Sequence, residues 1–328
     1  MSVRLKHTIA YGASMVALMV LQIVALTKPF ASLSDYDSEI VYSLVSQVFC
    51  MGLLPLFVLL LLKKNESVGA NFAYMRYKKP KDLKVCLLAS LGLMVLISPF
   101  TTVFNALTTM ILNIIGYKRG GHLGFIYNNV GDLFLIFFLA ALVPAVFEEF
   151  THRGILLSGL EDRGSEMSAV VLSAVCFGLM HTNPLQFLYA VVGGLVFGAA
   201  VTKSGSILPA MCAHFGNNAV AMYIDYSLQK NNKFAELYRS ITGSENVFSF
   251  AFLVAALAFS VFGVVWILQY LARKTEKPVS EKKLFGILPM DVYAPNGKAT
   301  LKDNAALIAT MVSETFLLAV MLVWGIFR

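Results

Sequence analysis

Two adjacent glutamates lie within one of the most apolar stretches of the chain, the run from Leu133 to Leu160. Glu148 and Glu149 are followed by Arg153, four residues after the second glutamate. A carboxylate near the middle of a bilayer costs roughly 2.5–3.5 kcal/mol on insertion scales, so it is retained only where it is paired, hydrated or useful. Two of them side by side therefore indicate chemistry within a membrane.

The spacing of these charges assigns them different partners. On a helix, Glu149 and Arg153 are one turn apart and can pair. Glu148 points about 100° away, toward another partner, and His152 lies one turn beyond it. The arginine can hold one carboxylate ionised while its neighbour faces a cavity and acts as a general base. The alternative is a buried ion pair that only ties helices together.

Two histidines lie in further apolar segments. His181 ends the run Phe177-Gly-Leu-Met-His181, and His214 has Asn218 one turn beyond it on the same helical face. Two neutral donors that point at one place can stabilise the oxyanion formed when water attacks a carbonyl. The alternative is hydrogen bonding between helices, the commoner role of a lone histidine in an apolar helix.

The composition is that of an all-α, polytopic membrane protein. Hydrophobic residues make up 58% of the 328 positions and charged residues only 14%, whereas a soluble domain has about 25% charged residues. At about 20 residues per span, the chain holds about nine spans, with eight possible. The segments are Thr8–Thr27, Glu39–Leu62, Val85–Ile115, Asp132–Ser158, Met167–His181, Leu185–Thr202, Ser206–Ile224, Val247–Leu271 and Ala305–Ile326.

The basic residues predict the orientation of the spans. They gather before the first span, between the second and third, and between the eighth and ninth: Arg4, Lys6, Lys63, Lys64, Arg76, Lys78, Lys79, Lys81, Lys84, Arg273, Lys274, Lys277, Lys282, Lys283, Lys298 and Lys302. By the positive-inside rule the N-terminus is cytoplasmic. Because these residues flank spans and form no single patch, the lipid bilayer is the predicted partner and nucleic acid is not.

The predicted spans divide into three parts. Residues 1–130 hold about three N-terminal spans, residues 131–225 a four-span catalytic core, and residues 226–328 the C-terminal helices with a basic cytoplasmic loop at 272–304. The first, second, eighth and ninth spans are almost purely apolar and predict a peripheral scaffold. Only Thr182-Asn183-Pro184 separates the fifth and sixth spans, which predicts a tight hairpin, and Gly194 and Gly198 predict close helix packing. We expect the polar groups to share a cavity below the cytoplasmic surface.

The polar residues together resemble the signature of a known family. Glu148-Glu149-x-x-x-Arg153, Phe177-x-x-x-His181 and His214-x-x-x-Asn218 are similar to the motifs of the CPBP family, the CAAX-protease and bacteriocin-processing (Abi) intramembrane endopeptidases. This family includes the type II CAAX prenyl endopeptidase. Pro209 and Gly154 fit the pattern, and His152 departs from it where an aromatic residue is common. The resemblance covers roughly Gly131 to Asp225.

The resemblance implies hydrolysis of a peptide bond in a small membrane-associated protein or peptide. Glu148 and His181 would activate water, His214 and Asn218 would stabilise the oxyanion, and Glu149 and Arg153 would order the site. Zinc is chemically possible on Glu148, His181 and His214, as a three-ligand site with an open position. The chain has no HExxH motif, and we favour the mechanism that requires no cofactor.

Two other functions compete with this hypothesis. A non-catalytic member of the family would act by binding, as in bacteriocin self-immunity, although it would not need every motif position. A proton-coupled transporter would use the same groups as an ion pathway, but the repeated halves or paired broken helices that many transporters show are not found in the sequence. The compact motif spacing favours a bacterial plasma membrane, where peptide bacteriocins, pheromones or lipid-anchored proteins are candidate substrates by family analogy.

Overall fold

The helices predicted from composition are present in the structure. The computed structural model describes residues 1–26, 35–118, 125–242, 247–275, 283–284, 288–289 and 298–327. Within these ranges the chain is helical except for short connections and one antiparallel pair of two-residue strands, β1 (Lys283–Leu284) and β2 (Leu288–Pro289). The all-α fold is therefore confirmed. Most of the predicted loop 272–304 lies outside the described residues.

Each of the nine predicted segments corresponds to a helix, and two further short helices lie between them. Some helices contain π-helical stretches (η). The helices are α1 (Val3–Leu26); α2 (Asp35–Leu44), η1 (Val45–Leu53) and α3 (Leu54–Leu62); α4 (Val68–Tyr74); α5 (Leu83–Ile114); α6 (Val130–Ile136), η2 (Phe137–Leu142), α7 (Val143–Glu149), η3 (Phe150–Leu157) and α8 (Ser158–Asp162); α9 (Glu166–Met180); α10 (Pro184–Ser204); α11 (Leu208–Lys230); α12 (Lys233–Thr242); α13 (Val247–Lys274); and α14 (Leu301–Phe327). The run from α6 to α8 is continuous and holds both glutamates.

Within the described residues, seven helices are long and apolar enough to cross a membrane: Val3–Ala25, Asp37–Leu62, Leu83–Ile114, Val130–Asp162, Pro184–Ser204, Ala251–Lys274 and Leu301–Phe327. They define a multi-pass integral membrane protein. Of the nine predicted spans, the fifth corresponds to α9, which has only 15 residues, and the seventh to α11, which is not among the seven. The total of nine and the orientation of the N-terminus stay predictions.

Local sequence signals explain where the helices of the site begin. The side chain of Asn129 accepts a hydrogen bond from the backbone of Asp132, whose own carboxylate caps the start of α6 in return. Asn183 caps α10, and Pro184 follows at a first-turn position where its missing N–H costs nothing. Since α9 ends at Met180, the predicted tight hairpin between α9 and α10 is confirmed.

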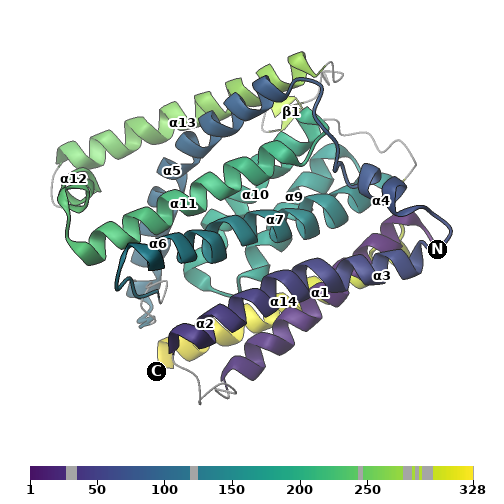
Figure 1. Cartoon of the computed structure of the whole chain (residues 1–328), viewed down its shortest axis with the longest axis horizontal. Helices are drawn as coiled ribbons and strands as arrows, with labels where there is room; N and C mark the ends of the chain where they lie inside the picture. Colours follow the sequence, from purple (N-terminus) through teal and green to yellow (C-terminus); the bar gives the residue numbers. More distant parts are fainter. Residues whose placement is uncertain are drawn as a thin grey trace.

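The helices run side by side between two ends of the molecule (Figure 1). The N-terminus, α4 and β1 lie toward one end, and α12, α6, the start of α2 and the C-terminus lie toward the other. α1 packs against α3 and α14, α5 packs against α13, and α9, α10 and α11 pack in the middle. The run from α6 to α8 contacts α1, η1, α9 and α11, so helices from distant parts of the sequence surround it.

The helices predicted to be a purely apolar scaffold also carry buried polar residues. Glu314 lies on α14 with 1% of its surface exposed, so intramembrane charge is not confined to the fourth segment. Gln47, on η1, donates a hydrogen bond to Glu148. A single carboxylate or amide barely changes the mean hydropathy of a span, so composition did not indicate that these two residues are buried or paired.

Candidate active site

A cavity of about 1730 Å³ opens into the middle of the helix bundle. Four of the predicted site residues line it: Glu148, His181, His214 and Asn218. Glu149 and Arg153 are fully buried (0% exposed) and are not among its lining residues. The structure thus brings all six together but separates four that face the cavity from two that lie behind it.

The cavity lies toward one end of the helix bundle. Its lining comes from the last turns of α1, the first turns of α2, the second half of α5 and the last turns of α11. These helix ends lie at the opposite end of the bundle from the loop 63–82. The ends of α9 and α10 that meet at Thr182 and Asn183 also form part of its lining. The membrane side to which the cavity opens stays a prediction.

Glu148 has a partner that the sequence did not suggest. Its Oε1 accepts a hydrogen bond of 2.8 Å from Nε2 of Gln47. The Nδ1 of His152 is 3.0 Å from the backbone carbonyl oxygen of Glu148 and so does not hold the carboxylate. A glutamine in an apolar segment was the available signal for Gln47, since an amide in a span needs a polar partner.

Glu149 forms the predicted ion pair and a second contact besides. Its Oε1 accepts from Arg153 Nη1 at 2.8 Å and from His214 Nδ1 at 2.9 Å. Within an apolar interior, hydrogen bonds between ionised groups are strong and leaving one partner alone is costly. One carboxylate therefore links the helix of the glutamates to α11.

Aromatic rings enclose the arginine. The guanidinium of Arg153 lies 4.4 Å from the ring centre of Phe177 and 5.4 Å from that of Phe197, both within the range of cation–π attraction. Its Nη2 donates to the carbonyl of Gly194 at 3.2 Å. A Cβ added at Gly194 would lie 2.8 Å from the Cα of Ala174, so the predicted close packing at this glycine is observed against α9.

Each of the two cavity-facing histidines forms a hydrogen bond through Nδ1. The Nδ1 of His181 is 2.8 Å from the carbonyl oxygen of Phe177, which can only accept, so Nδ1 carries a hydrogen and Nε2 is left as the acceptor of the neutral ring. In His214, Nδ1 donates to Glu149, and Nε2 lies 3.8 Å from Oε2 of Glu148. Phe197 stacks on His214 with ring centres 5.1 Å apart.

Asn218 completes the cavity-facing group. It lies one turn beyond His214 on α11, as the spacing predicts, and its Nδ2 is 3.3 Å from the carbonyl of Ala140 on η2. This long contact leaves the amide at the cavity wall, where it is half-buried. An amide held in this way can donate to a developing negative charge.

The described residues do not match the metal site considered above. No group of three or more histidine, cysteine, aspartate or glutamate side chains within them is arranged to hold a metal ion. The Nδ1 of His214 contacts Glu149, and its Nε2 lies 3.8 Å from Oε2 of Glu148. Both ring nitrogens therefore face other residues of the site. We therefore derive no step through zinc.

The fold and the site together define a multi-pass membrane protein with a cluster of carboxylates and imidazoles on the wall of an intramembrane cavity. Residues 130–220 match the family model of type II CAAX prenyl endopeptidase Rce1-like proteins. The predicted resemblance is thereby confirmed for the region that holds all six site residues, and it is a resemblance to a protease family. No curated protein and no solved structure matches the chain.

Proposed function

We propose that this protein is an intramembrane endopeptidase that hydrolyses a peptide bond of a membrane-associated protein or peptide. The observation that carries the proposal is the convergence of Glu148, His181, His214 and Asn218 on one cavity, with Glu149 behind them. A binding protein has no need for an acceptor imidazole, a carboxylate and two further polar side chains around one space. The match of this region to a protease family supports the same conclusion.

In the proposed reaction, Glu148 and His181 hold the attacking water. The water donates one hydrogen bond to the Glu148 carboxylate and another to Nε2 of His181, the acceptor nitrogen of the neutral ring. Its oxygen attacks the carbonyl carbon of the scissile bond while Glu148 takes the proton. When the C–N bond breaks, Glu148 returns that proton to the leaving amine, so protons and charge balance.

His214 and Asn218 stabilise the tetrahedral oxyanion. The imidazole of His214 is held by Glu149 through Nδ1 and presents Nε2 to the cavity, and the Asn218 amide donates from one turn away. This role requires a hydrogen on Nε2 of His214. Preorganised donors of this kind are worth about 10²–10³ in kcat each. Glu149 and Arg153 act as positioning residues, since neither lines the cavity.

The protein in this proposal belongs to a bacterial plasma membrane, and its substrate is a peptide bacteriocin, a pheromone or a lipid-anchored protein. The matched family is named after CAAX prenyl endopeptidases. We do not transfer a substrate from that name to this chain, because function depends on the individual site and not on the fold.

The test is cleavage of a membrane-peptide library by purified protein in detergent, with products identified by mass spectrometry. Wild type is compared with Glu148→Ala and His181→Ala, each with and without a chelator. Wild-type cleavage that both substitutions abolish supports the proposal, and persistence in chelator supports the mechanism without metal. Cleavage that survives both substitutions contradicts the site assignment. Binding of library peptides without cleavage favours the non-catalytic alternative.

A further inference from the structure

The two ends of the helix bundle differ in charge. One end holds the start of α1, the loop between α3 and α5, the turn between α8 and α9, the turn between α10 and α11, and the start of α14. We call it the basic end, after its basic residues Arg4, Lys6, Lys63, Lys64, Arg76, Lys78, Lys79, Lys81 and Lys84. Contacts tie these segments together: Ser2 to Asp303, Ile207 to Arg76, Ser206 to Lys78 and Lys203 to Glu166. By the positive-inside rule this end is cytoplasmic.

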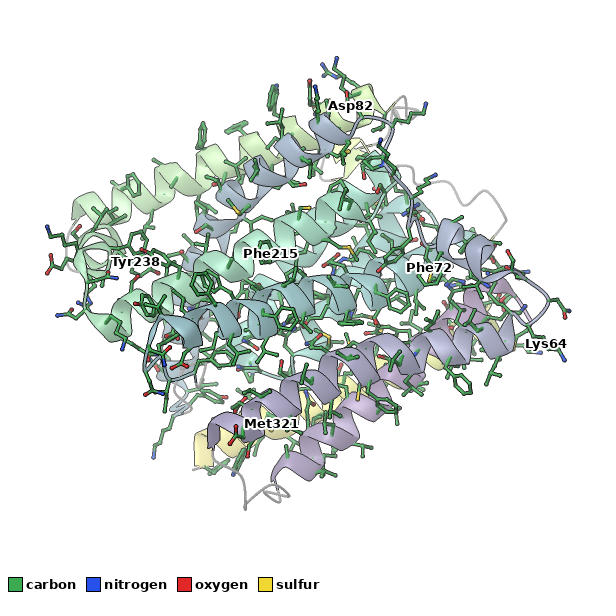
Figure 2. The ribbon with its side chains drawn as sticks, in the orientation of Figure 1. Lys64, Phe72, Asp82, Phe215, Tyr238 and Met321 are labelled. Atoms are coloured by element: carbon green, nitrogen blue, oxygen red, sulfur yellow. The ribbon has the colours of Figure 1, made fainter. Side chains whose placement is uncertain are left out.

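The cavity opens at the opposite end. Its lining includes Val24 near the end of α1, Glu39 near the start of α2 and Lys118 just beyond α5. Lys118 donates its backbone N–H to Gly325, near the end of α14, so these helix ends also lie together. Tyr238 and Met321, which line the cavity as well, lie toward the end with α12 and the C-terminus, whereas Lys64 lies at the basic end (Figure 2).

The turn between α9 and α10 borders the cavity at this end. α9 is about 22 Å long at 1.5 Å per residue, less than the ~30 Å hydrocarbon thickness of a bilayer. It starts near the basic end, where Glu166 pairs with Lys203. Its turn to α10, at Thr182 and Asn183, lines the cavity. α9 therefore runs from the basic end to a turn that borders the cavity.

A polar stripe on α5 leads from the opening toward the site. Six residues of its second half line the cavity at helical spacing: Ser98, Thr101, Thr102, Asn105, Thr109 and Asn113. Polar side chains within a span face the bundle interior or water rather than lipid, because lipid offers them no hydrogen-bond partner. Hydroxyl and amide groups in a row suit the alternating N–H and C=O groups of an extended peptide.

From these observations we infer that the site is entered from the non-cytoplasmic face, by an extended polypeptide segment that lies along the α5 stripe. The substrate part of this inference rests on the proposed function. The direction of entry does not, because it follows from charge distribution and cavity position alone. The candidate substrates are then membrane-anchored polypeptides whose scissile bond is on the outer side, and a chain end presented from the cytoplasm is excluded.

The direction of entry is tested by cysteine labelling, which requires no cleavage. The four native cysteines are replaced by alanine, and single cysteines are placed in the cavity (Asn105→Cys and Asn217→Cys) and at the basic end (Lys79→Cys). Phe262→Cys, on the outer surface of α13 with 76% exposure, is the lipid-facing control. A membrane-impermeant maleimide is applied to intact cells of a bacterial host and to inverted membrane vesicles.

We expect Asn105→Cys and Asn217→Cys to label in intact cells, Lys79→Cys to label only in inverted vesicles, and Phe262→Cys to label in neither. Cavity cysteines that label only in inverted vesicles would overturn the direction of entry. Cavity cysteines that label from neither side, while Lys79→Cys labels normally, would overturn the open polar path. If labelling occurs from outside but no peptide is cleaved in any assay, the direction stands and the proposed function fails.

The polypeptide part is tested by kinetics on a cleaved substrate. Asn105→Leu combined with Thr109→Val removes polar groups of the stripe at positions away from the catalytic residues. We expect KM to rise with kcat unchanged, because the stripe contributes binding and not chemistry. An unchanged KM would overturn the role assigned to the stripe.

Discussion

The Nδ1 of His214 donates to Oε1 of Glu149 across 2.9 Å, and this contact joins α11 to the helix of the two glutamates. The same oxygen accepts from Arg153, which is fully buried. Since the other nitrogen of His214 lies 3.8 Å from Glu148, the orientation of the imidazole at the cavity depends on Glu149. A residue that does not line the cavity thus determines how one that does is presented.

Removal of the Glu149 carboxylate should destabilise the protein strongly. In Glu149→Leu, Arg153 becomes an uncompensated buried charge, and breaking a buried pair in this way costs about 3–5 kcal/mol. The measurement is the free energy of unfolding in detergent. The control is Glu149→Leu combined with Arg153→Met, which removes both charges and should recover part of that loss. If the double variant is as unstable as the sum of its single variants, the two residues are not coupled.

Gln47 should contribute to turnover, through its 2.8 Å hydrogen bond to Glu148. A hydrogen bond to a charged group is worth about 1.5–3 kcal/mol, so Gln47→Leu should lower kcat/KM by roughly ten- to a hundredfold. The matched control is Gln22→Leu, which removes another cavity-lining glutamine, from α1. Equal losses in both variants would contradict a specific role for Gln47.

Neighbouring glycines of α10 should respond differently to the same substitution. A Cβ at Gly194 would meet the backbone of Ala174 at 2.8 Å, so Gly194→Ala should cost about 1–3 kcal/mol of stability through overpacking. A Cβ at Gly193 would meet only the ring of Phe197, at 3.6 Å. Gly193→Ala should be neutral or stabilising by up to about 1 kcal/mol, because alanine favours helix. Thermal unfolding of both variants decides, and equal shifts would contradict the packing argument.

Glu314 should weaken the fold. Within the described part of the chain, both of its carboxylate oxygens are buried without a hydrogen-bond partner. An unsatisfied buried polar group costs about 1–3 kcal/mol, so Glu314→Met should raise the free energy of unfolding by a similar amount and leave cleavage intact. A less stable Glu314→Met variant would show that the carboxylate has a partner that stabilises it.

The sequence predicted the helices and the members of the site better than it predicted their arrangement. Long apolar runs specify helices, and the four-residue spacing of Glu149 and Arg153 specifies their contact on one helix. The contact of Gln47 with Glu148 joins positions 101 residues apart, and no periodicity within either helix contains that information. The same holds for His214 and Glu149.

The end of the bundle at which the cavity opens is not contained in any single segment either. α9 has only 15 residues, and its turn at Thr182 lines the cavity. The end at which a cavity opens depends on how the neighbouring helices pack around this turn. That packing is a property of several segments together and not of one.

The central claim is that Glu148 is the general base of peptide hydrolysis. The most direct measurement is kcat for Glu148→Gln on a cleaved membrane peptide, with Glu314→Gln as the control for loss of an intramembrane carboxylate outside the cavity. Glu148→Gln keeps the shape of the side chain but cannot take a proton from water. We predict a loss of about 10²–10⁴-fold, the usual contribution of general acid–base catalysis, while Glu314→Gln stays near wild type. A Glu148→Gln enzyme that cleaves at the wild-type rate would contradict the account.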